Sequence, residues 1–299
     1  MTKRVLVLFG LMLIVVVAGL IAFYTLSLPK SRVLRVATTT SLYATSLLET
    51  LSEEFGKEHP GVVVQFIAVG SGEALKRAAK GDADMIFVHA PAAEKDYLEG
   101  GVLVDHRIFA YNYFVIVGPP DDPAGIKGLT PLEAFAKIYE AGEKGGALFV
   151  SRGDNSGTHQ REILLWSQTG LNPAGRPWYL ESGSGMAKTL LLANERGAYT
   201  LTDIGTFLKL RVKGKLPYLE VLIDKGELLE NVYSVYLVNP SKVPGVNYEL
   251  AREFADFVTS EKGQSIVGGY GVEEVGQPLF FPALGSGGLE EIWGKLSEG

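Results

Sequence analysis

Short apolar runs of the β-strand type alternate with amphipathic segments along most of this chain, and a turn rich in glycine and hydroxyl residues joins them. The run VLRVATTT at 33–40, for example, leads directly into the segment 41–59. We expect that segment to form one helix, because it carries apolar residues on one helical face: Leu47, Leu48, Leu51 and Phe55. An alternation of this kind is typical of an α/β fold.

The same order of strand, turn and helix recurs in both halves of the sequence. VVVQFIAV precedes GSGEALKRAAKGDA over 62–83, and ALFVSR precedes GDNSGTHQREILLWSQTG over 147–170. The turn GSGEALK at 70–76 is echoed by GSGMAK at 183–188. The match is too short to establish a duplication. It indicates two similarly built lobes, each with a helix N-terminus at the carboxyl edge of its sheet, where open α/β folds bind ligands.

Two strand-like segments that end in proline, 113–123 and 231–240, are candidates for crossing between the lobes, because proline interrupts a strand ladder. We therefore expect an α/β, two-lobed chain with mixed sheets flanked by helices. Its expected parts are an N-terminal membrane anchor or signal sequence, the first part of lobe 1, an inserted lobe 2 and a return to lobe 1: 1–30, 33–116, 117–234 and 235–299.

An uncharged apolar run at 5–28 follows Lys3 and Arg4. About 20 apolar residues span a bilayer as a helix, whereas the apolar region of a signal peptide has about 7–15 residues. An uncleaved transmembrane helix is therefore the favoured interpretation, and a cleaved signal peptide is the alternative. The basic N-terminus favours a cytoplasmic start, so we expect the globular part on the extracytoplasmic side of the membrane in either case.

Composition excludes several classes of protein. A net charge of −6 argues against nucleic-acid binding, because proteins that bind the phosphate backbone carry a concentrated basic excess. The absence of cysteine excludes disulfides, thiolate zinc sites and a lipid-modified N-terminal cysteine. The four histidines are scattered without the spacing of metal ligands, and we expect no cofactor and a monomer.

Glycine and hydroxyl residues at predicted helix starts suit an anion. Helix N-termini have unpaired N–H groups and a partial positive charge, serine and threonine add donors, and glycine permits close approach. A single turn of this kind usually only caps its helix. Four such turns in two lobes, one of them with Arg152, favour an oxyanion, because arginine adds a permanent charge and a planar fork of donors.

Six segments together carry a family resemblance: ATTTS at 37–41, AVGSGEALK at 68–76, GDADMIFVHA at 81–90, YNYFVIVGPPDDPAGIKG at 111–128, SRGDNSGTH at 151–159 and GAYTLTDIGTF at 197–207. They resemble the extracytoplasmic tungstate-binding proteins of ABC transporters. The resemblance implies a periplasmic-binding-protein fold of the type II kind. Its lobes would close on an oxyanion and deliver it to a membrane permease with its ATPase. The family includes lipoproteins, and this chain departs from them by lacking cysteine.

By position in these motifs, the resemblance implies that the anion is surrounded by residues of four turns: Thr38, Thr39, Thr40, Ser41, Ser71, Gly72, Arg152, Ser156, Gly157, Thr158, Ser184, Gly185 and Met186. The sequence leaves open whether His89, Tyr199 or Thr200 also line the cleft. Large aromatic residues are expected in the cores because they dominate buried area: Trp166, Tyr179, Phe207, Tyr233 and Phe254.

The identity of the anion needs a separate argument, because related phosphate-binding proteins share the SR and SGT pattern. Phosphate near neutral pH keeps a proton and is best recognised with a carboxylate acceptor, whereas tungstate is deprotonated and needs donors only. Similar phosphate binders place an aspartate where this chain has His89 and Ala90, with no carboxylate before Glu94. Asp154 is expected to cap a helix. Tungstate is therefore the favoured ligand and molybdate is the next candidate, with phosphate or sulfate as alternatives.

A phosphatase- or sulfatase-like hydrolase is the alternative class of function. The GDNSG at 153–157 is similar to the GDSG of serine proteases, but the additional asparagine breaks that motif. The turn at 70–77 lacks the lysine and hydroxyl pair of a nucleotide-binding loop. We assign no catalytic residue and expect a binding protein.

We predict that the mature protein retains residues 1–30 and stays with the membrane fraction, because the apolar run exceeds the length of a signal-peptide core. Intact-mass measurement of the protein from its own host checks this. A mature N-terminus between Ser27 and Arg32 would refute retention.

Overall fold

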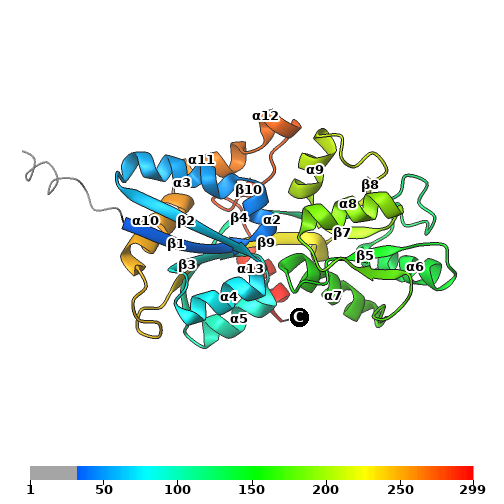
Figure 1. Cartoon of the computed structure of the whole chain (residues 1–299), viewed down its shortest axis with the longest axis horizontal. Helices are drawn as coiled ribbons and strands as arrows, with labels where there is room; N and C mark the ends of the chain where they lie inside the picture. The colour runs from blue at the N-terminus through cyan, green and yellow to red at the C-terminus, as the bar shows by residue number, and fades with distance from the viewer. Residues whose placement is uncertain (1–31, 299) are drawn as a thin grey trace, which may run out of the picture.

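The computed structural model describes residues 32–298, which form two α/β lobes side by side (Figure 1). Lobe 1 contains β1 (Arg32–Thr39), α2 (Thr40–Ala44), α3 (Leu47–Glu58), β2 (Val62–Val69), α4 (Ser71–Lys80), β3 (Met85–Val88), α5 (Pro91–Glu99), α10 (Tyr248–Thr259), α11 (Glu261–Gly269), α12 (Val272–Val275), β10 (Phe281–Pro282) and α13 (Leu289–Ser297). Lobe 2 contains α6 (Pro131–Glu143), β5 (Phe149–Ser151), α7 (Gly157–Thr169), β6 (Tyr179–Glu181), α8 (Met186–Arg196), β7 (Thr200–Asp203), α9 (Ile204–Val212), β8 (Glu220–Ile223) and the 3₁₀ helix η1 (Glu227–Leu229).

Two long strands, β4 (Leu103–Gly118) and β9 (Glu230–Val238), lie where the lobes join. The sheet of lobe 1 has the order β10-β4-β9-β3-β1-β2, with β1 parallel to β2 and β3 and with β9 antiparallel to β3 and β4. The end of β4, from Phe114 onward, pairs instead with β7 and β8 of lobe 2. One strand therefore contributes to both sheets, and its partners change after Tyr113. The expected boundaries at 116/117 and 234/235 stay predictions.

Each lobe has its own hydrophobic core. In lobe 1, Phe55, Phe87 and Phe254 pack between the sheet and its helices, and in lobe 2 Phe149 and Trp166 do the same. Burying a large apolar side chain stabilises a fold by roughly 1.5–3 kcal/mol. The aromatic residues expected in the cores are buried, except Tyr179, which is half-buried.

The prediction of one helix over 41–59 is wrong, because α2 ends at Ala44 and α3 begins at Leu47. Ser46 takes a left-handed φ of 64°, and the Thr45 hydroxyl donates to the carbonyl of Leu42 (2.6 Å), which ends the first helix. The apolar face of α3 is buried as expected. The break leaves α2 as a short helix that starts directly at the end of β1.

Within residues 32–298, no helix combines the length and the apolar character needed to cross a membrane. The expected anchor at 1–30 lies outside the described residues and stays a prediction.

Glu162 of α7 is a buried carboxyl group in lobe 2. It accepts hydrogen bonds from the Trp166 indole (3.2 Å) and the Tyr179 hydroxyl (2.6 Å). Burial raises its pKa from 4.5 to about 7. Ionisation of this group therefore opposes folding as the solution approaches neutral pH.

We predict that Glu162→Gln gains stability relative to the unchanged protein at pH 8 but not at pH 4. A carboxyl group whose folded pKa is raised loses its contribution to stability as the pH rises from about 4.5 to about 7, whereas an amide does not ionise. The difference is on the order of 2–3 kcal/mol. Urea unfolding across this range measures it, with the exposed Glu291→Gln as control. Parallel pH curves for the two proteins would contradict the assignment.

Candidate anion-binding site

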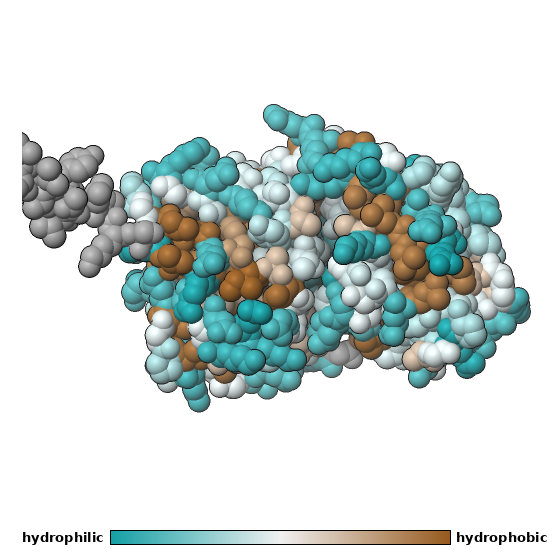
Figure 2. All heavy atoms as spheres, viewed as in Figure 1, coloured by the Kyte–Doolittle hydropathy of each residue, from teal (hydrophilic) through white to brown (hydrophobic). Residues whose placement is uncertain are grey.

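The four predicted turns lie where the lobes face each other. Because β1 and β2 are parallel, with Thr39 paired to Val69, the starts of α2 and α4 lie at the same carboxyl edge of the lobe 1 sheet. From lobe 2, Arg152 follows β5, and the starts of α7 and α8 come next along the chain. Pale residues of intermediate hydropathy line the surface where the lobes meet (Figure 2), as expected for glycine, serine and threonine.

The turns of the two lobes touch, so the structure shows the lobes closed on each other. A Cβ atom placed on Gly72 would lie 2.8 Å from Nδ2 of Asn155, and one placed on Gly157 would lie 2.7 Å from the carbonyl oxygen of His89. Neither glycine has a positive φ. At Gly157 glycine is therefore required by the approach of the opposite main chain and not by the backbone conformation, whereas at Gly72 an added methyl group would displace the amide of Asn155.

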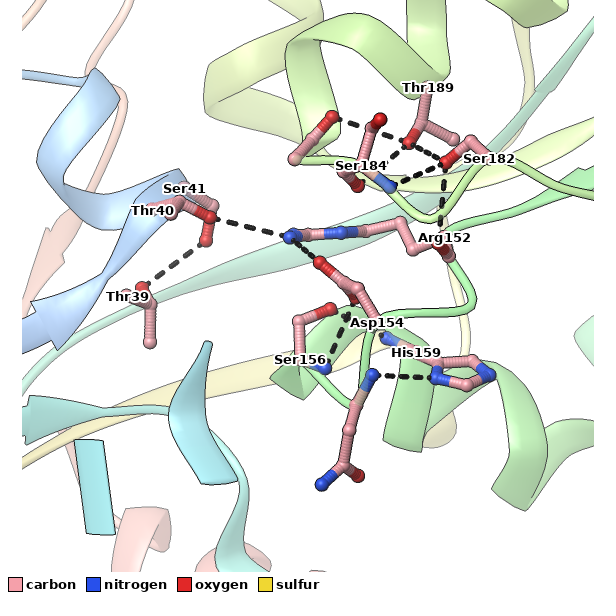
Figure 3. A network of polar contacts seen from close by, with 12 residues as sticks. Thr39, Thr40, Ser41, Arg152, Asp154, Ser156, His159, Ser182, Ser184 and Thr189 are labelled. Carbon is pink, nitrogen blue, oxygen red and sulfur yellow. Dashed lines mark hydrogen bonds and ion pairs between the residues drawn. The ribbon is translucent and has the colours of Figure 1, made fainter. Parts of the chain in front are cut away.

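Arg152 is the central charge of this region and is only 1% exposed. Its Nη2 forms an ion pair with Asp154 and donates to the Thr40 hydroxyl of the other lobe (3.3 Å) (Figure 3). A surface ion pair with Asp154 or Glu162 would be the structural alternative to an anion site for this arginine. The structure pairs Arg152 with Asp154, but in a buried position, and Glu162 bonds elsewhere.

The expectation that Asp154 caps a helix is wrong. The cap of α7 is Ser156, whose hydroxyl accepts from the N–H of His159 (3.3 Å). Asp154 instead accepts from the N–H of Ser156 (3.2 Å) and pairs with Arg152. Both carboxylate oxygens of Asp154 are therefore engaged by protein donors.

Several buried side-chain donors of the predicted turns have no hydrogen-bond partner among residues 32–298: Oγ1 of Thr38, Oγ of Ser71, Nε and Nη1 of Arg152, and Oγ1 of Thr158. A buried donor without a partner costs roughly 1–3 kcal/mol, and more when it is charged. Thr38 and Ser71 come from lobe 1, and Arg152 and Thr158 come from lobe 2. The chain therefore presents donors from both sides, and a ligand with several acceptor oxygens would satisfy them.

Two of the helices add main-chain donors. The N-cap residues of α4 and α8 are Gly70 and Gly185, and neither helix receives a side-chain cap. Their first N–H groups are therefore not engaged by capping side chains, and each helix start contributes about half a positive charge. A cavity of about 350 Å³ adjoins the starts of α2 and α8, but not that of α4, and is lined by both lobes: Thr40, Ser41, Ala44, Gly183, Ser184, Gly185, Met186, Ala187, Lys188 and Thr206.

The sequence left open whether three residues line the cleft, and the structure places one of them among the predicted turns and the other two in lobe 2. His89 lies at the site, in contact with Ser41 and Gly157. Tyr199 is buried in lobe 2, where its hydroxyl donates to Asp122 (2.8 Å), and Thr200 donates to the neighbouring carbonyl of Leu201 (3.4 Å).

Sequence reasoning missed two residues near the turns. Asn155 packs against Gly72 from a left-handed position, with φ 55°. Asp203 is a buried N-cap of α9, and burial raises its pKa while the charge of Arg152 opposes that shift. A signal for Asp203 was present in the sequence, because aspartate before an apolar segment is a common N-cap.

Comparison with known proteins shows the family to which the chain belongs. Residues 27–262 match the PBP superfamily domain. The tungstate-binding protein TupA of Peptoclostridium acidaminophilum is 40% identical over 250 residues, which cover 83% of this chain and 84% of that protein. The chain belongs to the PBP superfamily, in the family of these tungstate-binding proteins.

Solved structures of the PBP superfamily have the same architecture. The tungstate binding protein TupA from Desulfovibrio alaskensis G20 superimposes with a TM-score of 0.71 at 41% identity, covering 84% of this chain and 98% of that chain. The structure described as the tungstate ABC transporter from Geobacter sulfurreducens gives a TM-score of 0.69 at 43% identity, covering 80% and 98%. The predicted two-lobed fold and the predicted family are both confirmed.

Proposed function

We propose that this chain is the substrate-binding component of an ABC importer, which captures tungstate outside the cytoplasmic membrane and delivers it to a permease. The observation that carries the proposal is the set of buried, unpartnered donors from both lobes at Thr38, Ser71, Arg152 and Thr158. The relatives named as tungstate-binding proteins support it. In this proposal residues 1–30 hold the protein at the extracytoplasmic face of the membrane.

The proposed anion contacts fall into two kinds. The hydroxyls of Thr38, Ser71 and Thr158 and the guanidinium of Arg152 are the side-chain donors. Main-chain N–H groups of the helix starts would complete the shell, from the predicted residues Thr39, Thr40, Ser41, Gly72, Gly157, Gly185 and Met186. The N–H groups of the other two predicted residues, Ser156 and Ser184, already donate to Asp154 and to the Ser182 hydroxyl. Donors from both lobes make closure and binding one event, because only the closed form brings both sets to the same anion.

The balance of donors and acceptors favours tungstate over phosphate. A protonated oxyanion needs an acceptor, and the carboxylate of Asp154 is already engaged by Arg152 and by the N–H of Ser156. His89 stands where similar phosphate binders carry an aspartate, and it brings no negative charge. Among the described residues of the turns, the remaining free groups are the hydroxyls of Thr38, Ser71 and Thr158 and the guanidinium of Arg152, with no further carboxylate. Such a set matches a fully deprotonated dianion better than a protonated one. Molybdate has the same charge and shape, so it is the next candidate.

One observation favours the alternative class, a hydrolase. Ser41 Oγ lies 3.4 Å from Nε2 of His89, whose Nδ1 is 2.8 Å from Oδ1 of Asn231, an order similar to nucleophile, base and orienting residue. Burial lowers the pKa of His89 to about 4, which makes the imidazole a weak base. Binding therefore remains the stronger proposal. Turnover of a chromogenic phosphate or sulfate ester that is lost in Ser41→Ala would favour the hydrolase instead.

We predict that Arg152→Ala lowers tungstate affinity by roughly ten- to a hundredfold, because hydrogen bonds to charged groups contribute about 1.5–3 kcal/mol. Arg152→Lys should recover only part of the loss, since a point charge does not reproduce the planar fork. Calorimetric titration of the soluble fragment with tungstate, molybdate, sulfate and phosphate measures both effects. The half-exposed Arg176→Ala is the matched control.

Unchanged tungstate affinity in folded Arg152→Ala would remove Arg152 from the proposed site. If the unchanged protein bound phosphate more tightly than tungstate, the proposed substrate would be wrong while an anion-binding function would stand.

We also predict that Gly157→Ala weakens tungstate binding and reduces the compaction that accompanies it. The added methyl group would lie 2.7 Å from the carbonyl oxygen of His89, so the lobes could not approach as closely as they do here. Small-angle scattering with and without tungstate measures the change in the radius of gyration. The control must be a glycine with open space around it and a negative φ, which excludes Gly170. Gly56→Ala, in an open position of α3, is suitable. Equal compaction of Gly157→Ala and the unchanged protein would contradict closure at this contact.

A further inference from the structure

A buried row of polar side chains runs from the anion-facing turn of lobe 1 to the strands that join the lobes. Ser41 Oγ lies 3.4 Å from Nε2 of His89, and Nδ1 of His89 lies 2.8 Å from Oδ1 of Asn231 on β9. Nδ2 of Asn231 donates to Oδ1 of Asn112 on β4 (2.9 Å), and Nδ2 of Asn112 donates to the carbonyl of Leu279 (3.2 Å). All four side chains are at most 2% exposed.

The main-chain carbonyl at the end of this row determines the direction of every bond in it. The carbonyl of Leu279 only accepts, so the amide NH₂ of Asn112 must face it and the amide oxygen of Asn112 must face Asn231. Asn231 then turns its NH₂ to Asn112 and its oxygen to His89. The neutral imidazole therefore carries its proton on Nδ1, which leaves Nε2 as an acceptor toward Ser41.

The surroundings of His89 agree with an uncharged ring. The imidazole stacks on the ring of Tyr233 with the centroids 4.9 Å apart, and it is also nearly parallel to the ring of Phe114, whose centroid is 6.0 Å away. The charged groups that act on it are Arg152 and Arg161, which both oppose a positive imidazolium. Burial lowers the pKa of His89 to about 4, with these two charges as smaller causes.

We propose that His89 is a positioning residue of the anion site, which holds the hydroxyl of Ser41 and ties the first turn of lobe 1 to the strands that cross between the lobes. The Ser41 hydroxyl donates to His89 and lies 3.3 Å from the Thr39 hydroxyl, from which it accepts. The hydroxyls of this turn therefore have two different roles. Those of Thr39 and Ser41 orient the turn, and that of Thr38 is left for the anion.

This division deepens the proposed function and rests on it. The Ser41 hydroxyl has one hydrogen and donates it to Nε2 of His89, so only the main-chain N–H of Ser41 is left to bind the anion. The turn is then held by a row that ends on β4 and β9, so the position of the anion donors depends on the strands at which the lobes join. Gly157 of lobe 2 closes against the same histidine, because a Cβ there would lie 2.9 Å from Nε2.

Two substitutions test the roles of the two imidazole nitrogens separately. His89→Asn keeps a donor where Nδ1 lies but has nothing at Nε2, so it should keep the bond to Asn231, lose some stability because the side chain is smaller, and bind tungstate about three- to tenfold more weakly. His89→Gln places an amide oxygen near Ser41 but gives up the bond to Asn231. It should unfold at lower urea and keep tungstate affinity within about threefold.

The proposal is overturned if His89→Asn binds as tightly as the unchanged protein, or if His89→Gln is the weaker binder of the two. Nitrogen-15 spectra of histidine-labelled protein at neutral pH give a readout that needs neither variant to fold. We expect His89 to be neutral with the proton on Nδ1, and a proton on Nε2 would overturn the row. Failure of the unchanged protein to bind tungstate would instead reject the proposed function, and the spectra would still test the direction of the hydrogen bonds.

Discussion

The buried guanidinium of Arg152 is the constraint on which the arrangement of the two lobes depends. A charge removed from water costs several kcal/mol unless partners replace its hydration. Asp154 and the Thr40 hydroxyl engage only Nη2 of Arg152, and Nε and Nη1 have no partner among the described residues. A charge held in this way is costly for the protein alone and well suited to a doubly charged oxyanion.

The small residues around this charge follow from the same constraint. Donors on two lobes reach one ion only if the main chains approach closely. A side chain at Gly157 would collide with the main chain of His89, and one at Gly72 would displace the Asn155 amide. Serine and threonine supply donors without bulk. The glycine N-caps of α4 and α8 leave helix N–H groups free of capping side chains. The small side chains and the uncapped helix starts are therefore as important to this region as the charge of Arg152.

The connection between the site and the joint of the lobes gives closure a structural basis. β4 pairs with strands of both sheets, and β9 starts beside the point at which β4 changes partners. Asn112 and Asn231 face each other on these two strands and bond to each other and, through His89, to the first turn of lobe 1. A movement of one strand against the other would therefore change the position of the donors in that turn.

The sequence by itself determined the fold class, the family and the four turns, because strand periodicity, glycine and hydroxyl turns and Arg152 are local patterns that do not require knowledge of the packing. It did not determine the break between α2 and α3, since the apolar pattern favoured one continuous helix. In the structure Ser46 is left-handed and the carbonyl of Thr45 accepts from Lys209 and Tyr270, which lie far away in the sequence. The partners of Asp154 and the position of His89 between Ser41 and Asn231 were also beyond it, because they join residues up to 142 positions apart. Such contacts exist only once the two lobes and their crossing strands are in place, so tertiary structure alone decided which hydroxyls remain free for an anion.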